Sequence, residues 1–359
     1  MPDPRVTAYA ELLVDRSIGV RPGWQVLVAM TTEARPLAQE LSRLLAARGA
    51  YALTRLHFGA AFPVDRDWLE TAPPDLAGTL PPLELDLLER VDASIFVLAP
   101  EPGGETMGQE PLRALRAQAL AYRARGRARE IPSVRCDFPC TAYAERAGLP
   151  LAEFEDVLYA ACLRDWDAEG RRLEPLRARL QAASEIRIVG DGTDLRLGVA
   201  GRTWAIDDGH QNVPGGEIFT SPVEDSVEGE ISFDFPGFTG GGEVCGSRLV
   251  FRGGEVVEAT AEAGEGLLRQ ALATDEGARR VGELGIGCNE GITHRLRNVL
   301  FDEKMAGTVH VALGDGFPSL GGRNTSGIHW DLVRDLRGGG EIWCDGELVQ
   351  KDGAWTIPA

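Results

Sequence analysis

Short apolar runs alternate with amphipathic segments along the first half of the sequence. Residues 24–30 (WQVLVAM) follow an Arg-Pro-Gly turn and are almost entirely apolar, which predicts a buried strand. Residues 33–48 carry leucines at helical spacing, and the apolar runs at residues 52–56 and 93–100 predict two further strands. Because strand–helix–strand alternation is typical of a mostly parallel sheet covered by helices, we predict an α/β domain over residues 1–184.

The pattern changes where a long helical stretch, residues 152–183, gives way to the apolar run EIRIVG at residues 185–190. Beyond this point glycine becomes frequent and the apolar runs shorten. Residues 193–204 (TDLRLGVAGRTW) have the pattern of a hairpin with a glycine turn. These features predict a second, glycine-rich α+β domain over residues 185–359, which contains the candidates for a metal site.

Two runs in this second half alternate strictly between apolar and polar positions. In GTVHVALG, apolar residues alternate with positions that include His310, and in IHWDL they alternate with His329 and Asp331. Successive side chains on a strand point to opposite faces, so His329 and Asp331 share a face. Two imidazoles and a carboxylate in one short region predict a divalent transition-metal site. Hydrogen-bonded core histidines and a turn-capping aspartate are the alternative interpretation.

Two glutamates lie among small residues that allow a ligand or the backbone to come close. Glu217 follows a Pro-Gly-Gly turn, and Glu283 lies in VGELGIGCN. Either glutamate alone would be interpreted as a solvated surface charge. Together with His310, His329 and Asp331, they supply three carboxylates and two imidazoles. Such a set is sufficient for two divalent metals that share a bridging carboxylate and leave a position open for water.

Composition and missing motifs narrow the possible functions. The formal net charge of −18 argues against nucleic acid or an anionic membrane as the main partner. The sequence has no run of eighteen apolar residues and no pattern of a secretory signal, so we expect a cytoplasmic protein. The six cysteines are expected to be free thiols. Dinucleotide-binding, P-loop and nucleophile-elbow motifs do not occur, which disfavours redox chemistry with a dinucleotide and hydrolysis through a covalent intermediate.

Four segments of the second half are long and chemically specific: NVPGGEIFTSP, GELGIGCN, LFDEKMAGTVHVALG and GGRNTSGIHWDL. With the N-terminal stretches YAELL, VRPGWQVLV and EARPLAQEL, they resemble the thermophilic aminopeptidase family, which includes aminopeptidase T and aminopeptidase S. The resemblance extends over nearly the whole chain. It implies removal of N-terminal amino acids from peptides with a free N-terminus, and it implies a homodimer.

The resemblance also implies a pair of divalent metal ions (zinc, cobalt or manganese) held by five residues: Glu217, Glu283, His310, His329 and Asp331. Water activated by the two metals would hydrolyse the first peptide bond. Glu217 or Glu283 would transfer the proton, although a glutamate that binds both metals is a poor base. Lys304 and Asp302 are expected to have supporting roles rather than chemical ones.

The sequence departs from the family pattern at Phe317, where the family usually has a tyrosine, and in a shorter interval between His310 and His329. Two alternatives to the peptidase therefore stay open. Two histidines and one carboxylate also form the facial triad of mononuclear iron oxygenases, and ring-cleaving dihydroxypyridine dioxygenases resemble the same fold. The second alternative is a non-catalytic peptide-binding relative.

Overall fold

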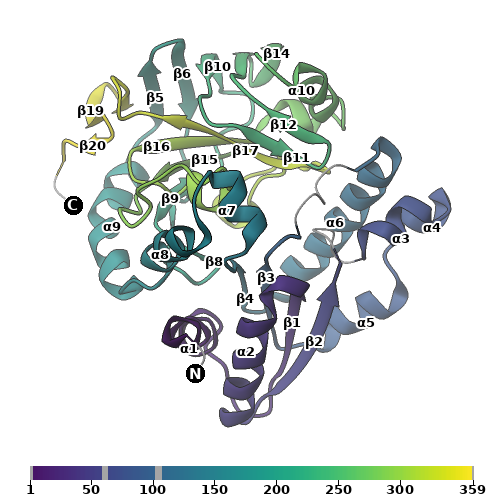
Figure 1. Cartoon of the computed structure of the whole chain (residues 1–359). Helices are drawn as coiled ribbons and strands as arrows, with labels where there is room; N and C mark the ends of the chain where they lie inside the picture. The colour runs from purple at the N-terminus through teal and green to yellow at the C-terminus, as the bar shows by residue number, and fades with distance from the viewer. Residues whose placement is uncertain (1–2, 59–63, 102–106, 358–359) are drawn as a thin grey trace. The chain divides into compact units, whose positions relative to one another are not determined.

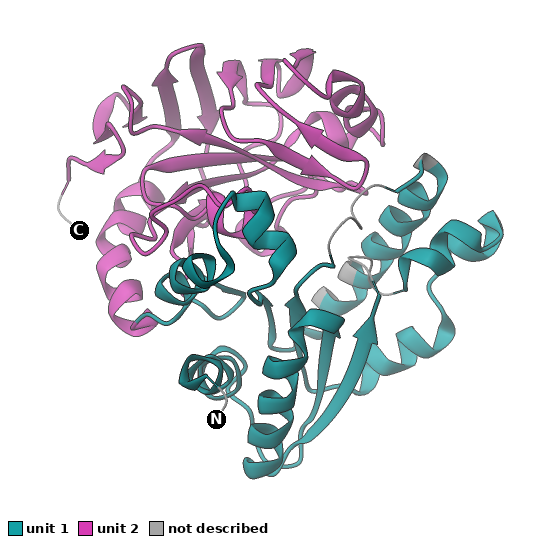
Figure 2. Ribbon diagram, viewed as in Figure 1, with its two compact units in different colours: residues 1–164, 209–215 teal, residues 165–208, 216–359 magenta. Residues whose placement is uncertain are grey.

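The computed structural model describes residues 3–58, 64–101 and 107–357. They form two compact units (Figure 2): unit 1 comprises Met1–Arg164 and Gly209–Gly215, and unit 2 comprises Asp165–Asp208 and Gly216–Ala359. This division does not coincide with the predicted boundary at residue 184. The last helix of the predicted first domain lies in unit 2, because its leucines pack into the hydrophobic core of that unit.

Unit 1 is built on a five-stranded sheet of order β2-β1-β3-β4-β8 (Figure 1), in which every neighbouring pair is parallel. Its strands are β1 (Gln25–Thr31), β2 (Tyr51–His57), β3 (Ala93–Leu98), β4 (Ser133–Asp137) and β8 (Asn212–Val213). The predicted parallel α/β architecture of the first half is confirmed. β8 is distant in sequence from the other four strands, and no local sequence pattern predicts it.

The helices of unit 1 follow the predicted alternation with strands. In α2, the buried residues Leu37, Leu41 and Leu45 recur every four positions and form one apolar face. The predicted helix at residues 152–183 is two helices, because Asp165 accepts a hydrogen bond from the backbone N–H of Ala168 and caps a new start. The helices are α1 (Pro4–Glu11), a π-helix (Leu12–Ser17), α2 (Arg35–Ala47), α3 (Arg66–Thr71), α4 (Pro74–Ala77), α5 (Pro82–Arg90), α6 (Gln109–Arg129), α7 (Thr141–Ala147) and α8 (Leu151–Cys162).

Unit 2 contains two large antiparallel sheets, which fits the α+β class predicted for the second half. An eight-stranded sheet has the order β14-β13-β10-β6-β5-β18-β19-β20, and a five-stranded sheet has the order β17-β16-β15-β9-β7. The first comprises β5 (Glu185–Gly190), β6 (Thr193–Gly198), β10 (Glu228–Ser232), β13 (Arg248–Arg252), β14 (Glu255–Thr260), β18 (Glu341–Cys344), β19 (Glu347–Lys351) and β20 (Ala354–Trp355). The second comprises β7 (Ala205–Asp207), β9 (Glu217–Thr220), β15 (Val281–Gly287), β16 (Thr308–Gly314) and β17 (His329–Asp335).

The remaining elements of unit 2 are β11 (Gly237–Thr239) paired with β12 (Gly242–Val244), and the helices α9 (Trp166–Gln181), α10 (Glu265–Leu272) and α11 (Val299–Asp302). The prediction of a hairpin at residues 193–204 is wrong, because only one strand, β6, lies in this range. The chain turns earlier, at Asp191 and Gly192, where Gly192 has φ +60°, and β6 pairs back onto β5. After β6 the chain leaves this sheet, and β7 joins the other one.

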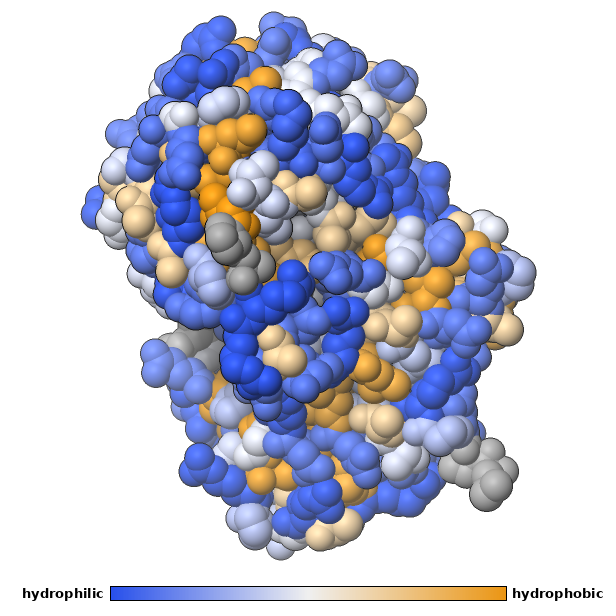
Figure 3. All heavy atoms as spheres, turned by 90° about the vertical axis from the view of Figure 1, so that its left-hand side faces the viewer, coloured by the Kyte–Doolittle hydropathy of each residue, from blue (hydrophilic) through white to orange (hydrophobic). Residues whose placement is uncertain are grey.

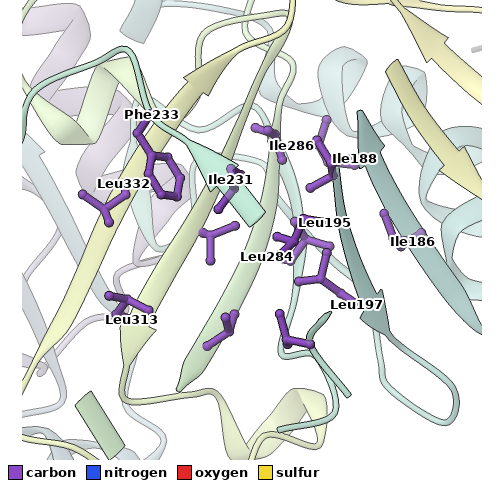
Figure 4. Packing of buried hydrophobic residues seen from close by; sticks show 14 of the residues in the cluster. Ile186, Ile188, Leu195, Leu197, Ile231, Phe233, Leu284, Ile286, Leu313 and Leu332 are labelled. Atoms are coloured by element: carbon purple, nitrogen blue, oxygen red, sulfur yellow. The ribbon is translucent and has the colours of Figure 1, made fainter. Parts of the chain in front are cut away.

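The core of unit 2 lies between its two large sheets. Figure 4 shows Ile188 and Leu195 of the eight-stranded sheet beside Leu284 and Ile286 of β15 in the buried cluster. Apolar residues at alternate positions of β15, β16 and β17 fill this space, as is usual when two sheets pack face to face. The opposite face of the five-stranded sheet is therefore left for its polar residues.

Hydrophilic residues cover much of the face shown in Figure 3, with apolar residues gathered in smaller groups. Within the described residues, no helix combines the length and the apolar character that a membrane span requires.

Candidate metal centre

The five-stranded sheet of unit 2 brings all five predicted ligand residues onto one face. Glu283, Gly285 and Gly287 alternate along β15 and therefore point the same way. Gly285 pairs with His310 on β16, and Gly287 pairs with Glu217 on β9, so these side chains share that face. The two remaining candidates, on β17, pair with β16 positions that lie two and four residues after His310. They too belong to this face.

The five side chains form two groups joined by Glu283. His310 Nε2 lies 3.4 Å from Glu217 Oε2 and 3.5 Å from Glu283 Oε1. His329 Nε2 lies 3.0 Å from Glu283 Oε2 and 3.6 Å from Asp331 Oδ1. We call Glu217, Glu283 and His310 the inner group, and Glu283, His329 and Asp331 the outer group. In each group one potential ligand atom per residue lies within 4.8 Å of the others.

Exposure distinguishes the two groups. The His310 side chain is 1% exposed and that of Glu217 is 5% exposed, so the inner group is closed off from solvent. In the outer group, the side chains of His329 and Asp331 are 25% and 15% exposed. The outer group is therefore the more exposed of the two.

Both imidazoles are oriented by backbone carbonyl groups. His310 Nδ1 lies 3.2 Å from the carbonyl oxygen of Glu303, and His329 Nδ1 lies 2.7 Å from that of Asp315. When Nδ1–H donates to a carbonyl oxygen, the lone pair of a neutral imidazole is on Nε2. Both Nε2 atoms face the carboxylates of the cluster, which is the arrangement that metal-binding histidines adopt.

Two buried carboxylate oxygens of the cluster have no hydrogen-bond partner: Glu217 Oε2 in the inner group and Asp331 Oδ1 in the outer group. A buried oxygen without a partner is costly, and most such atoms in proteins are satisfied. These two are the oxygens that face the histidine Nε2 atoms. Oxygen and imidazole nitrogen donors in this arrangement fit divalent transition metals.

Glycine on β15 makes room for the cluster. A Cβ atom at Gly285 would lie 2.1 Å from Cε1 and 2.2 Å from Nε2 of His310. A Cβ atom at Gly287 would lie 2.2 Å from the carbonyl oxygen of Met305. No side chain fits at such distances, so glycine is required at Gly285, beside the histidine, and at Gly287, beside the backbone of Met305.

A buried lysine and two further carboxylates adjoin the inner group. Lys304 is 0% exposed, and its Nζ lies 2.6 Å from Glu303 Oε1, 2.9 Å from Glu217 Oε1 and 3.8 Å from Asp207 Oδ2. Glu303 also has a ligand atom close to those of His310 and the outer-group aspartate. Asp302 accepts hydrogen bonds from two backbone N–H groups of the preceding loop. The supporting role expected of Asp302 and Lys304 fits these contacts.

Sequence reasoning did not identify Glu303 or Asp207 as members of this cluster. Glu303 stands in the charged run DEK, which has the appearance of a solvated turn, and Asp207 stands in AIDDG. Their positions follow from pairing between distant strands, which a local pattern does not encode. For Lys304 the sequence does offer one indication of a special role, because it contains only two lysines.

The carboxylates and imidazoles of the cluster shift one another's protonation. Burial raises the pKa of Glu217 to about 8, against the opposing charges of Lys304 and His310. Burial also opposes ionisation of Glu283, but hydrogen bonds with His310 and His329 hold its pKa well below the usual range. For both histidines, burial is outweighed by the neighbouring carboxylates, which raise each pKa to about 10. Without metal, the imidazoles retain protons at neutral pH.

These shifts predict that the metal-free protein loses stability as the pH rises from about 7 to about 10. The pKa values of His310 and His329 are about 10 when folded and 6.5 ordinarily, so their stabilisation is complete below pH 6.5 and disappears as the pH rises through 10. Glu217, with a pKa of about 8 against 4.5, acts in the same direction. Thermal unfolding in the presence of a chelator measures this slope.

The zinc-loaded protein is the control for this prediction. Metal binding displaces the protons, so its unfolding temperature should depend much less on pH over the same range. A metal-free protein whose stability stays constant or rises toward pH 10 would contradict the assigned proton positions.

Phe317 forms one wall of the centre. Its ring packs edge-on against His329, with 5.5 Å between ring centroids, and against Phe219 of β9, with 5.4 Å. Its backbone N–H donates to Ser221 Oγ, and the Ser221 hydroxyl donates to the carbonyl oxygen of Gly282. The position at which the sequence departs from the resembled family therefore lies in contact with a candidate ligand.

Comparison with known proteins identifies the family. Residues 3–355 match the family model described as thermophilic metalloprotease (M29). Aminopeptidase T of Thermus thermophilus is 37% identical over 181 residues, which are 46% of this chain and 43% of the relative. Aminopeptidase T of Thermus aquaticus is 32% identical over 54% of each chain. The chain thus aligns with about half the length of these two relatives.

Two comparisons extend over most of the chain. Aminopeptidase 2 of Geobacillus stearothermophilus is 27% identical over 87% of this chain and 83% of its own. The solved structure of wild-type AmpT from Thermus thermophilus superposes with a TM-score of 0.82 at 25% sequence identity, covering 99% of both chains. The predicted family is confirmed: the chain belongs to the thermophilic metalloprotease family M29.

Proposed function

We propose that this protein is a metallo-aminopeptidase that uses two divalent ions to hydrolyse the N-terminal peptide bond of unblocked peptides. The observation that carries the proposal is the placement of Glu283, whose two carboxylate oxygens lie 3.5 Å and 3.0 Å from the Nε2 atoms of two different histidines. A carboxylate in this place can bridge two ions. The relatives named aminopeptidase support the choice of peptide as substrate.

The residues of the two groups would hold one ion each, with Glu283 shared. The ions would polarise the scissile carbonyl and lower the pKa of a water molecule. The more exposed outer group is where a peptide would arrive, and the carboxylate of Asp331 there can attract its free α-ammonium group. Phe219 and Phe317 offer an apolar wall beside His329.

The family resemblance implies proton transfer by Glu217 or Glu283. Glu283 faces both histidines and would be engaged by both ions, which makes it a poor proton carrier. Glu217 is the better candidate of the two. Glu303 is a further candidate, because it belongs to the same cluster without belonging to either group that shares Glu283.

The proposal is tested with metal-free protein reconstituted with zinc, cobalt, manganese or iron(II). We expect release of the first residue from aminoacyl-nitroanilides and unblocked peptides, and none from the same peptides after N-acetylation. Glu217→Ala, His310→Ala and Asp331→Ala should each abolish release. Wild-type rates in these variants would refute the site. Activity with one iron and consumption of oxygen would support the dioxygenase alternative, and metal binding without turnover would support a peptide-binding relative.

Phe317→Tyr is expected to raise kcat, because it adds a hydroxyl at a ring that already contacts His329. If that hydroxyl donates a hydrogen bond to the developing oxyanion, a gain of ~1–2 kcal/mol corresponds to roughly tenfold in kcat. Steady-state kinetics with a leucyl or phenylalanyl nitroanilide measure it, and Phe219→Tyr is the matched control on the adjoining ring. An unchanged kcat would show that this branch of the family does not use the hydroxyl.

The predicted homodimer remains a proposal, and the edge of the unit 1 sheet supports it. β2 is an edge strand on which Tyr51 is 66% and Leu56 is 42% exposed, and Leu83 on α5 is 75% exposed. Apolar side chains of this size on a sheet edge favour association. Sedimentation velocity at micromolar concentration should give twice the chain mass of 38.7 kDa, whereas a monomer would contradict the proposal.

A further inference from the structure

Arginine greatly outnumbers lysine in this sequence. Of 37 basic residues, only Lys304 and Lys351 are lysines. Lys351 is solvent-exposed, with an ion pair of 3.2 Å to Glu341, whereas Lys304 is 0% exposed. An ammonium is a compact charge with three donors, whereas a guanidinium is a wide, planar fork, so the two are not interchangeable when buried. In a chain whose basic residues are almost all arginine, this buried position has a lysine.

The surroundings of Lys304 explain why a compact cation fits there. Three carboxylates from separate elements converge on its Nζ: Asp207 from the end of β7, Glu217 from the start of β9 and Glu303 from the turn after α11. Asp207 and Glu217 are directly paired across the two strands. The ammonium therefore occupies the point where the sheet and this turn meet.

Lys304 also determines which oxygen of Glu217 is available. Glu217 Oε1 accepts a hydrogen bond from Lys304 Nζ at 2.9 Å, so Oε2 is left to face His310 Nε2 at 3.4 Å. The ion pairs of Lys304 are with Asp207, Glu217 and Glu303, and none of them is with a residue of the outer group. Among the five candidate ligands, Lys304 therefore forms a direct ion pair with Glu217 of the inner group.

The charges of the cluster agree with this arrangement. Five carboxylates surround the two histidines and Lys304: Asp207, Glu217, Glu283, Glu303 and Asp331. With the imidazoles neutral, five negative charges and one ammonium leave four negative charges, which two divalent cations neutralise. A buried cluster of this kind is stable only when its charges are paired.

We propose that Lys304 is a positioning residue for the inner metal position: it holds Glu217 by Oε1 so that Oε2 is presented beside Glu283 and His310. The proposal rests on the two-metal centre proposed above. It adds that the two positions are unequal. The inner position depends on the buried ammonium, and the outer position does not.

Because the chain has only two lysines, the positioning role of Lys304 can be tested in the wild-type protein. Incorporation of 13Cε-lysine gives only two lysine side-chain NMR signals, and Lys351→Arg identifies the exposed one. Zinc is titrated into the labelled, metal-free protein. The Lys304 signal should shift with one of the two equivalents of zinc and remain in place during the other, while the Lys351 signal stays unmoved throughout.

The outcomes of the titration separate the two proposals. Two bound zinc ions with an unmoved Lys304 signal would overturn the positioning role and leave the metal centre standing. A Lys304 signal that shifts equally with both equivalents would overturn the selective dependence of the inner position. Absence of zinc binding would remove both proposals.

Lys304→Met gives a second measurement, with Lys351→Met as its matched control. We expect affinity for zinc at one position to fall about 10–100-fold in Lys304→Met, with the other position unchanged, by competition with a chromophoric chelator. Loss of a positive charge alone would strengthen the binding of a cation. Weaker zinc binding at one position would therefore indicate that Glu217 is no longer aligned. Two ions bound with wild-type affinity would overturn the proposal. Should Lys304→Met not fold, the labelled wild-type protein still decides the question.

Discussion

Glu283→Ala is expected to remove zinc from both positions and to lower kcat/KM by at least ~10³-fold, which corresponds to ~4 kcal/mol of transition-state stabilisation. The reason is that each of its carboxylate oxygens faces a different histidine, so both groups lose a ligand at once. Glu217→Ala and Asp331→Ala each remove a ligand from one group only. These two variants should retain roughly one zinc ion per chain, and Glu283→Ala should retain none.

The measurement is the ratio of zinc to protein after gel filtration, together with steady-state kinetics on the same samples. Glu290→Ala is the matched control, because the side chain of Glu290 is 68% exposed and its nearest ion-pair partner, Arg172, is 3.8 Å away. That variant should bind two ions and keep wild-type activity. Two zinc ions retained by Glu283→Ala would contradict the shared placement of this carboxylate.

Gly285→Ala is expected to damage the same centre through packing rather than charge. Its Cβ would lie 2.1 Å from Cε1 of His310, and the ring is held from behind by the backbone carbonyl of Glu303. Overpacking of this kind costs ~1–3 kcal/mol of unfolding free energy, and a displaced Nε2 no longer faces Glu217 and Glu283. We expect both a lower unfolding free energy in denaturant and the loss of the inner zinc ion.

Gly266→Ala serves as the control, since Gly266 lies in α10 and the added carbon would have no atom within 4 Å other than those of its chain neighbours and its own helix backbone. Replacing a helical glycine by alanine should stabilise the protein by ~0.5–1 kcal/mol and leave zinc binding unchanged. If Gly285→Ala behaved like this control, His310 would not occupy the position that the centre requires.

Local sequence patterns are sufficient to predict part of the fold and part of the site. Strict alternation in β16 and β17 determines which residues share a face, because a strand shifted by one position would expose its apolar set. That reasoning places His329 and Asp331 together, as the pairing with β16 bears out. The family could be predicted because its motifs are long and include all five candidate ligands in order.

Other features depend on contacts between distant parts of the chain. The position of α9 in unit 2 follows from leucines that find their partners in sheets formed later in the sequence. Two neighbouring glycine-containing turns look alike in the sequence, so the pattern predicts the hairpin at the wrong turn. Only the pairing of β6 with β5 distinguishes the two turns. Lys304 and Glu303 look like surface charges, since charged residues are seldom buried unless paired. The partners of Lys304 on β7 and β9 are about ninety residues away, and Glu303 is paired with Lys304.

We expect one face of the unit 2 sheet to hold two divalent ions that share Glu283. Anomalous diffraction at the zinc edge from crystals of the zinc-loaded protein tests it most directly. Two peaks are predicted, both in contact with the Glu283 carboxylate, one beside Glu217 and His310 and the other beside His329 and Asp331. A single peak bound by the two histidines and Asp331, with Glu217 unbound, would contradict a two-metal centre.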